Sequence, residues 1–432
     1  MRQFLFISTL FFSIQLIGQI NVLIIESDDQ SNQAVGAFGN PFMVTPNIDK
    51  LAAEGTSFTS AYNMGCWSPA VCVPSRMMLI YGKYLWKAQK INARNKPISM
   101  PEIFKQNGYE TYMTGKWHAW GNYPKNIFDT TGTITEGQLK TYKTSKGHIT
   151  NITGDEAVNY IRNYKKKKPF FAYVAFNAPH VPRETSQNYY DLYPIENIEL
   201  PPSVKDGLPL NKNVKYQYTN NPLSAKTMKK RVQQNNAMVT HMDKKIGDII
   251  KALKDKKMYN NTIIVFMSDH GISFGENNNA TKVAVYEPNV TAPLIIRNPK
   301  DLSPKKIKDR VYLQDIVPTL IDILNLKTVA KLDFKSLKPL IEKQQAVRET
   351  IYLAMFNAQR AIIKGDDKLI LFPETKDLEL YNLDSDPWET NNLINTAGAN
   401  KKIKGLLKDF LVWQKKAKDT LDITTTYSKY FN

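Results

Sequence analysis

Residues 20–29 read Ile20-Asn21-Val22-Leu23-Ile24-Ile25-Glu26-Ser27-Asp28-Asp29, a short apolar run that stops at acidic residues. A continuous apolar run of this length, rich in branched aliphatic side chains, is typical of a strand that is buried on both faces of a parallel sheet. The acidic pair follows directly where the run ends. We therefore predict a buried parallel strand with carboxylates at its carboxyl end.

Two further runs repeat this pattern. Residues 262–267 are apolar and precede Ser268-Asp269-His270-Gly271, and residues 170–176 precede Asn177-Ala178-Pro179-His180. Between them, residues 237–254 carry apolar side chains at helical spacing. Strand, helix and strand in this order indicate an α/β domain with a parallel sheet.

The polar residues at the three strand ends are expected to meet. In open α/β sheets, ligands bind beyond the carboxyl ends of the strands. A single acidic pair in such a place is ordinary loop chemistry. Three endings that can bind a metal or a proton on one sheet edge indicate one site.

The pattern changes towards the C-terminus. Residues 184–233 are rich in Pro, Asn and Lys, and we interpret them as a long surface excursion. Residues 361–364 and 368–372 predict a hairpin, and residues 402–416 predict an amphipathic helix. We expect a catalytic domain over residues 20–340, with a large mixed, mainly parallel sheet flanked by helices, and a smaller α+β subdomain over residues 341–432.

The N-terminus indicates export. Arg2 precedes the mostly apolar residues 4–17 and then Gly18-Gln19, which is typical of a signal peptide over residues 1–19. The alternative is a buried first strand behind a disordered leader. No later apolar run is long enough to span a bilayer, so we predict a periplasmic or secreted protein without a stable membrane anchor.

The charge balance is strongly basic. The chain has 58 Lys and Arg against 40 Asp and Glu, a net charge of +18. Such a charge attracts nucleic acid, anionic membranes or an acidic polymer, although a solvated Lys-rich surface gives the same count. No zinc-finger spacing or aromatic RNA-binding signature accompanies it, so we expect no nucleic-acid partner.

Only two cysteines are present, Cys66 and Cys72. A disulfide between them would close only a short loop and would add modest stability.

Cys72-Val73-Pro74-Ser75-Arg76 resembles the Cys-x-Pro-Ser-Arg signature of the formylglycine-dependent sulfatases, in the alkaline phosphatase superfamily. The same resemblance extends to Thr45–Ala52, Gly108-Tyr109-Glu110-Thr111-Tyr112-Met113-Thr114-Gly115-Lys116-Trp117-His118, Ser268-Asp269-His270-Gly271, Lys282 ahead of Tyr286-Glu287, and Leu380-Tyr381-Asn382-Leu383. Val73 is bulkier than the small residue usual at its motif position, and Thr114 stands where a small or aliphatic residue is usual.

The resemblance implies a mechanism in which a maturation enzyme oxidises Cys72 to formylglycine. The aldehyde hydrates, one diol oxygen attacks sulfur, and the second hydroxyl then expels sulfate. The resemblance also implies the other site residues: Asp28, Asp29, Asp269 and His270 hold Ca²⁺ together with residue 72; Arg76 stabilises the diol; Lys116 and Lys282 contact the sulfate; and His118 and His180 donate protons or contact the sulfate, His180 being our choice for the leaving group.

Simpler interpretations exist for each of these residues. Cys72 alone would be a buried structural thiol, Asp28 or Asp29 would cap a helix, and either lysine would be solvated surface. His241 lies on the apolar face of the predicted helix, so we expect a core residue there. We expect His148 to be an ordinary loop residue.

The substrate class is also inferred from resemblance. Pro179-His180-Val181-Pro182, Leu192-Tyr193-Pro194 and Ile198-Glu199-Leu200-Pro201 look like the iduronate-2-sulfatase-type branch, which acts on sulfated sugars. Together with export and basic charge, this favours a sulfatase of sulfated oligosaccharides or polysaccharides. The alternatives are a phosphodiesterase or phosphonate hydrolase of the same fold, and an exported calcium-stabilised binding protein with an unconverted Cys72.

Overall fold

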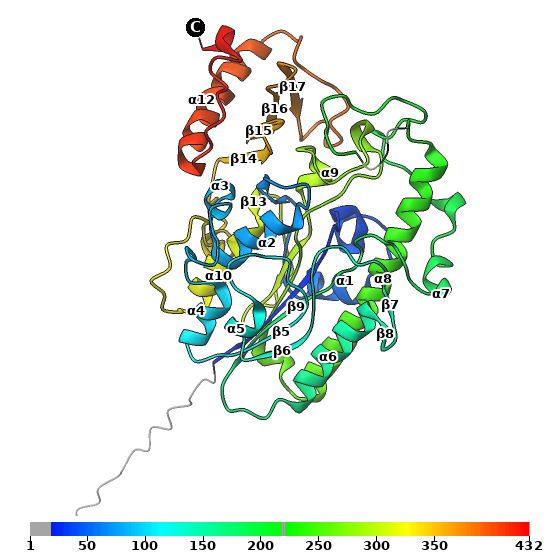
Figure 1. The fold of residues 1–432 in the computed structure, drawn as a ribbon, viewed down its shortest axis with the longest axis vertical. Coiled ribbons are helices and arrows are strands. Elements are labelled where there is room, and N and C mark those ends of the chain that lie inside the picture. The colour runs from blue at the N-terminus through cyan, green and yellow to red at the C-terminus, as the bar shows by residue number, and fades with distance from the viewer. Residues whose placement is uncertain (1–18, 218, 220, 432) are drawn as a thin grey trace, which may run out of the picture.

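The computed structural model describes residues 19–217, 219 and 221–431. The predicted signal peptide lies outside these residues apart from Gln19. The described chain forms a large sheet sandwiched between helices, with a second sheet and the C-terminal helix packed at one end (Figure 1). Within the same residues, no helix combines the length and apolar character that a membrane crossing requires.

The large sheet has eight strands in the order β12-β2-β11-β10-β1-β9-β5-β6. Their bounds are Lys305–Ile307, Thr56–Phe58, Leu294–Arg297, Thr262–Ser268, Asn21–Ser27, Phe170–Ala175, Glu110–Lys116 and Thr130–Thr135. Strand β1 pairs in parallel with β10 and β9, while β11 runs antiparallel to both of its neighbours. The prediction of a mixed, mainly parallel sheet is confirmed.

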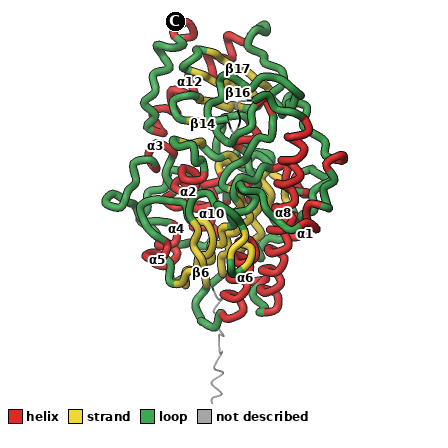
Figure 2. Tube along the Cα trace, turned by 45° about the vertical axis from the view of Figure 1, so that its right-hand side comes forward, coloured by secondary structure: helices red, strands yellow, loops and turns green. Residues whose placement is uncertain are grey.

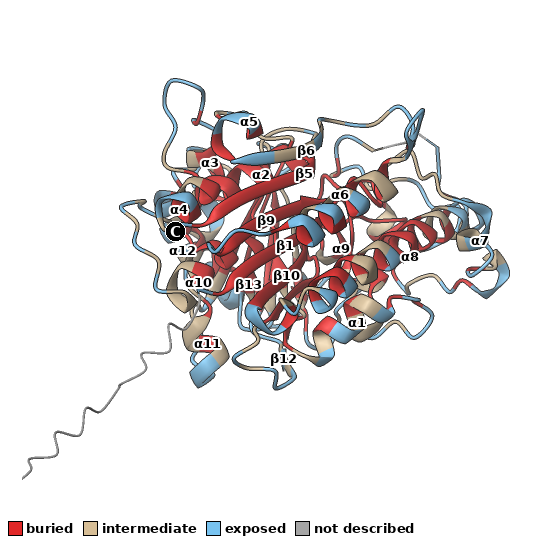
Figure 3. Cartoon of the chain, turned by 90° about the horizontal axis from the view of Figure 1, so that it is seen from below, coloured by how far each residue is buried: buried red, intermediate tan, exposed pale blue. Residues whose placement is uncertain are grey.

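Strand β1 is buried on both faces because its side chains alternate between two apolar cores. Val22 and Ile24 belong to one core, and Leu23 and Ile25 belong to the other. This alternation follows from the two-residue period of a strand. The second core contains side chains of α1 (Pro46–Ala53), α6 (Ile149–Asn163) and α8 (Ala225–Asp255), whereas the first contains side chains of α2 (Cys72–Tyr81), α4 (Met100–Gln106) and α10 (Ile316–Ile323). Figure 3 shows the buried strands between these helices.

Helix α8 is longer than the sequence pattern predicts, because it begins at Ala225 rather than near residue 237. The side chain of Ser224 caps it by accepting a hydrogen bond from the backbone N–H of Thr227. The predicted surface excursion therefore ends at residue 224, and residues 225–233 were wrongly included in it. These first turns are Lys-rich, which hides the helical period of their few apolar residues.

The second sheet has the strand order β17-β16-β15-β14-β4. Its bounds are Asp377–Asn382, Asp367–Phe372, Gln359–Lys364, Thr350–Met355 and Gly65–Cys66. The predicted hairpin is present as β15 and β16, and the predicted C-terminal helix is α12 (Ala399–Ala417), which packs on this sheet. Strand β4 comes from the segment that precedes Cys72, so the two parts of the chain are joined there. The boundary at residue 341 stays a prediction.

Shorter elements complete the described chain, much of which is loop (Figure 2). They are β3 (Ala61–Tyr62), α3 (Leu85–Ala88), α5 (Pro124–Ile127), β7 (Lys143–Thr144), β8 (Gly147–His148), α7 (Gln187–Tyr190), α9 (Glu287–Val290), β13 (Val311–Tyr312) and α11 (Lys338–Lys343).

A buried lysine links the second sheet to helix α9. Nζ of Lys368, on β16, lies 2.9 Å from Oε1 of Glu287 and 2.7 Å from Oε1 of Glu389. Oε2 of Glu389 also accepts the backbone N–H of Glu287 at 2.7 Å. One ammonium group cannot neutralise two carboxylates. Burial raises the pKa of Glu389 to about 7, although Lys368 acts in the opposite direction.

This cluster predicts a pH dependence of stability. An unfolded glutamate titrates near pH ~4.3, so folded Glu389 holds a proton that the unfolded chain releases. The stability from this proton is complete below that pH and is lost as the pH rises through about 7. We expect the free energy of unfolding of the wild type to fall relative to that of Glu389→Gln over roughly pH 5 to 8. Urea denaturation of both proteins measures this, and parallel pH profiles would contradict it.

Candidate active site

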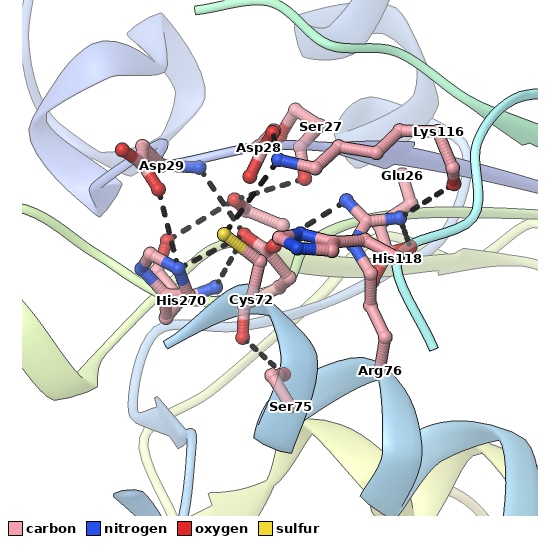
Figure 4. Close-up of polar contacts among 12 residues, drawn as sticks. Glu26, Ser27, Asp28, Asp29, Cys72, Ser75, Arg76, Lys116, His118 and His270 are labelled. Carbon is pink, nitrogen blue, oxygen red and sulfur yellow. Dashed lines mark hydrogen bonds and ion pairs between the residues drawn. The ribbon is translucent and has the colours of Figure 1, made fainter. Parts of the chain in front are cut away.

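The predicted site residues converge at the carboxyl edge of the large sheet (Figure 4). Asp28 and Asp29 follow β1, Asp269 and His270 follow β10, and Lys116 ends β5. Other segments supply the remaining residues: Cys72 and Arg76 from α2, His118 from the loop after β5, His180 from the loop after β9, and Lys282 from the loop between β10 and α9. The meeting of the three strand ends, expected from the sequence, is therefore observed.

Cys72 is the first residue of α2 and is 1% exposed. Its Sγ lies 3.6 Å from Nζ of Lys116 and 3.3 Å from Nζ of Lys282. Burial alone would raise the pKa of the thiol, yet Lys116 and Lys282 lower it well below its usual value. Hydrogen bonds with His118 and His180 lower it further. The position of residue 72 therefore favours negative charge.

Arg76 lies one helical turn after Cys72 and is completely buried. Its Nη1 donates to Oε2 of Glu26 at 2.8 Å and to the backbone carbonyl of Lys116 at 3.0 Å. Its Nη2 lies 3.3 Å from Oδ2 of Asp269. The guanidinium thus joins α2 to the ends of β1, β5 and β10, and an effect of Arg76 on residue 72 would act through these groups.

Glu26 was not predicted as a site residue, although the sequence contains a signal for it. A carboxylate in a strand that is buried on both faces needs a partner. Glu26 has two, because the hydroxyl of Tyr173 also donates to its Oε2. Burial raises the pKa of Glu26, and Arg76 opposes that rise. Ser75 was also missed: its hydroxyl donates to the backbone carbonyl of Asp269 at 2.6 Å and anchors α2 to the end of β10.

Asp29 lies at the centre of the polar contacts. Its Oδ1 is 2.9 Å from Nζ of Lys282 and 3.2 Å from Nε2 of His270, and its Oδ2 is 3.8 Å from Nε2 of His180. Burial alone would raise the pKa of Asp29, but these three neighbours hold it well below its usual value. The adjacent Asp28 forms an ion pair with Lys116.

The tautomer of His270 points to a cation position. Its Nδ1 lies 2.8 Å from the carbonyl oxygen of Gly271, and because a carbonyl only accepts, Nδ1 carries the hydrogen in the neutral ring. Nε2 then faces Asp29 and also Asp269, whose Oδ1 is 3.7 Å away. A lone pair that faces two carboxylates requires a proton or a metal between them. The two carboxylates accordingly outweigh burial and raise the pKa of His270 to about 9.

The donor set fits a hard divalent cation. Ligand atoms of Asp28, Asp29, Cys72 and His270 lie within 4.8 Å of one another. Oδ1 of Asp28 is buried without a hydrogen-bond partner, whereas Oδ2 of Asp269 is paired with Arg76 and Nε2 of His270 faces Asp29. Carboxylate oxygens of this kind suit Ca²⁺. Asp269 is outside the group of close ligand atoms, since its Oδ1 accepts the backbone N–H of Asp29 and of His270, so its role as a ligand stays a prediction.

Two histidines complete the surroundings of Cys72. Nδ1 of His180 lies 2.7 Å from the carbonyl oxygen of Val181, which leaves Nε2 directed at the site. His118 has a left-handed backbone, with φ 48°, and its backbone N–H donates to Oε2 of Glu136 at 3.1 Å. His118 is partly exposed, whereas His180 is buried. The site therefore reaches solvent beside His118.

The other two histidines serve the structure. His241 is buried, its Nδ1 lies 3.0 Å from Oγ1 of Thr185, and its Nε2 lies 2.7 Å from Oδ1 of Asn151. Burial lowers its pKa to about 3, which keeps the ring neutral. His148 caps α6 by accepting the backbone N–H of Thr150. The expectation of a core role for His241 is confirmed.

Comparison with known proteins gives two family matches. The sulfatase family model matches residues 20–326, and the model of the N-sulphoglucosamine sulphohydrolase C-terminal region matches residues 275–417. A sulfatase of Formosa agariphila is 31% identical, and the match covers 89% of this chain and 85% of the relative.

Two more distant matches agree with the first. Human iduronate 2-sulfatase is 28% identical, with 65% of this chain and 60% of the relative covered. A structure in complex with its substrate D-glucosamine-2-N,6-O-disulfate superposes with a TM-score of 0.78 at 23% identity, covering 93% of this chain and 99% of the other. This last match shows the fold.

The ion pair between Arg76 and Glu26 yields a prediction. Glu26→Gln removes the nearer of the two carboxylates that pair with the buried Arg76 and leaves Asp269 as the other, so we expect the free energy of unfolding to fall by about 3 kcal/mol, the lower end of the range for a broken buried pair. Tyr173→Phe is the matched control, because it removes only the hydroxyl that donates to Glu26 and should cost about 1 kcal/mol. Chemical denaturation measures both, and equal losses would show that the ion pair is not the stabilising contact.

Proposed function

Because this chain belongs to the sulfatase family, we propose that it releases inorganic sulfate from sulfated carbohydrates, with a formylglycine made from Cys72 and a bound Ca²⁺ ion. As a family member it is a sulfuric ester hydrolase, and the iduronate 2-sulfatases are among its relatives. The nucleophile, the metal, the residue roles and the substrate class are the proposed parts.

One observation carries the proposal: two ammonium groups lie within 3.6 Å of the side chain of residue 72 in a buried site. A sulfate ester is an anion, so it repels an oxygen nucleophile unless positive charge surrounds both. Lys116 and Lys282 supply that charge from two segments that lie far apart in the sequence. Each is oriented by a carboxylate, Asp28 for Lys116 and Asp29 for Lys282.

The Sγ atom of Cys72 marks where the reactive oxygens of the converted residue would lie. A maturation enzyme would oxidise the thiol to an aldehyde, whose hydrate supplies the attacking oxygen and a second hydroxyl that later expels sulfate. Arg76 holds the start of α2 against the strand ends. This contact fixes the direction in which residue 72 points.

A proton must reach the departing alkoxide, and His180 is placed to provide it. Its Nδ1 is engaged by the carbonyl of Val181, so the proton is delivered from Nε2, which faces the site. His118 lies at the solvent side and would contact the sulfate or the leaving alcohol there. The proposed roles therefore differ with burial: the buried His180 donates the proton, and the partly exposed His118 contacts the sulfate or the leaving alcohol.

The cation would be held by Asp28, Asp29 and His270, together with Asp269 and the converted residue 72. When bound, Ca²⁺ supplies positive charge to the sulfate and to the oxygen of residue 72. The unpaired Oδ1 of Asp28 supports this assignment, since a buried oxygen without a donor is costly unless a metal binds it.

Several observations support an exported enzyme that acts on sulfated carbohydrates. One relative is named iduronate 2-sulfatase, and a protein of the same fold was solved with a disulfated glucosamine. The net charge of +18 favours an anionic polymer. Together with the predicted signal peptide, this supports an enzyme of the periplasm or the medium, with a formylglycine-generating enzyme as its partner during maturation.

The central experiment measures sulfate release by protein produced together with a formylglycine-generating enzyme. Mass spectrometry of the peptide around residue 72 first verifies that Cys72 has lost mass on conversion. We expect sulfate release from at least one member of a panel of sulfated glucosamine, heparin and carrageenan oligosaccharides, and none from Cys72→Ala. Converted protein that releases no sulfate from this panel but cleaves aryl phosphonate esters would overturn the proposal.

Metal binding is tested independently of activity. We expect Ca²⁺ at about 100 times its Kd to stabilise the wild type by about 2.7 kcal/mol. Asp29→Asn should lose most of this stabilisation, because one carboxylate charge leaves the group of ligand atoms. Asp243→Asn is the matched control: Asp243 is another buried carboxylate, but it accepts the backbone N–H groups of Asn47 and Ile48 at the start of α1. Thermal unfolding with Ca²⁺ or with a chelator gives the result, and equal calcium effects in both variants would exclude Asp29 as a ligand.

A further inference from the structure

Four aromatic side chains lie on segments that adjoin the site residues, and two of them, Trp120 and Tyr216, are exposed. Trp67 precedes Cys72 by five residues, and Trp120 follows His118 by two. Their ring centroids are 6.2 Å apart with an interplanar angle of 54°, and Trp120 is 49% exposed. These two rings therefore come from the loop that leads into α2 and Cys72 and from the loop that carries the partly exposed His118.

Trp120 is held in place by the helix that begins at Cys72. Its backbone N–H contacts Sδ of Met77 at 3.0 Å, and its carbonyl accepts the hydroxyl of Tyr81 at 2.9 Å. Both partners are residues of α2. The ring is thus exposed although its backbone is fixed, which distinguishes it from an aromatic side chain on a loose loop.

A second aromatic pair lies next to the first. The rings of Tyr216 and Phe356 stack with centroids 4.9 Å apart, and Tyr216 is 51% exposed. The backbone N–H of Phe356 donates to the carbonyl of Cys66 at 2.9 Å, which places Phe356 beside the segment of Trp67. We call Trp67, Trp120, Phe356 and Tyr216 the aromatic rim.

The Tyr216 side of the rim is tied to the site as well. Oε1 of Gln217, the next residue, accepts the backbone N–H of Ala280 at 2.9 Å. Ala280 precedes Lys282 by two residues. Both pairs of the rim are consequently anchored to segments that carry groups in contact with Cys72.

The chemistry of the rim suits a sugar ring. Isolated exposed apolar side chains are common on proteins and need no explanation. Paired rings at the mouth of a charged site are different, because ligand sites combine aromatic walls with a few polar groups that fix orientation. A pyranose has an apolar C–H face that can lie on an aromatic ring, while its sulfate projects to the lysines.

We propose that the aromatic rim binds the pyranose rings of a sulfated glycan, with one ring on the exposed Trp120, which Trp67 contacts, and a further ring on the exposed Tyr216, which stacks on Phe356. This inference rests on the proposed function and extends it. Two stacking surfaces accommodate two sugar rings, so the enzyme acts on oligosaccharide chains in preference to monosaccharides.

Binding is measured first, in protein that cannot turn over. Cys72→Ala protein is titrated by calorimetry with heparin tetrasaccharide and with carrageenan tetrasaccharide, and then again with Trp120→Ala or Tyr216→Ala added. A stacked ring is worth about a factor of five to ten in affinity, so each added substitution should raise the Kd for the tetrasaccharide that binds by about that factor. Trp120→Phe, which retains an aromatic ring, should restore part of the affinity.

Leu302→Ala is the control for loss of an exposed apolar side chain. Leu302 is 42% exposed and follows β11, which runs antiparallel to β10, so it lies at the opposite edge of the sheet from Cys72. We expect Leu302→Ala, added to the Cys72→Ala protein, to leave the Kd for the tetrasaccharide equal to that of the Cys72→Ala parent. An unchanged Kd in Trp120→Ala and Tyr216→Ala, or no binding of either tetrasaccharide by the parent, would overturn the inference.

Kinetics with converted enzyme separate this inference from the proposed function. Trp120→Ala should raise KM for the sulfated tetrasaccharide about tenfold and leave kcat within about twofold, because the rim binds rings that do not react. For a sulfated glucosamine monosaccharide, Tyr216→Ala should raise KM less than Trp120→Ala does. Sulfate release with unaltered KM in both variants refutes the rim and leaves the proposed function intact. Binding that depends on the rim without sulfate release refutes the proposed function alone.

Discussion

The buried ion pair between Arg76 and Glu26 is the contact on which the rest of the site depends. Removing each charge from water costs several kcal/mol, and at 0% exposure this cost is offset by the pairing of Arg76 with Glu26 and, at a longer distance, with Asp269. The pair fixes the first turn of α2 against the ends of β1 and β5. Because Cys72 is one turn away, its side chain is held beside the two lysines, and every other polar group arranges itself around that position.

A local backbone contact orients the rings of two site histidines. Both His180 and His270 engage Nδ1 with the carbonyl of the residue that follows them, Val181 and Gly271. This local contact sets the tautomer without any help from distant groups, and it directs Nε2 of each ring inward. Nε2 of His270 then faces Asp29 and Asp269, and Nε2 of His180 lies 3.8 Å from Oδ2 of Asp29. The same backbone contact thus orients both rings towards the acidic residues of the site, as the proposed cation and proton donor require.

The sequence predicts β1, β9 and β10 and the meeting of their ends, because these central strands are continuous apolar runs, and it predicts the part of α8 that has a clear helical period. It was insufficient where no period exists. Strand β4 is two residues long, Gly65–Cys66, and its pairing with β14 bridges almost three hundred residues of sequence. Glu26 was overlooked because it was read as part of a strand ending, although a carboxylate between two apolar cores demands a partner. The exposure of His118 depends on a left-handed backbone that no pattern of residue types specifies.

Strand β4 also explains how the second sheet takes part in the site. It enters this sheet immediately before Trp67 and Cys72, while Gln359 of β15 accepts the backbone N–H of Val285 near Lys282. The second sheet thus supports both walls of the mouth but supplies none of the charged groups around Cys72 that the strand ends provide. The rim is anchored to α2 through the backbone of Trp120 and to the second sheet through the backbone of Phe356. Because these anchoring contacts use backbone atoms of the rim residues, the exposed rings can vary while Arg76 keeps its ion pairs.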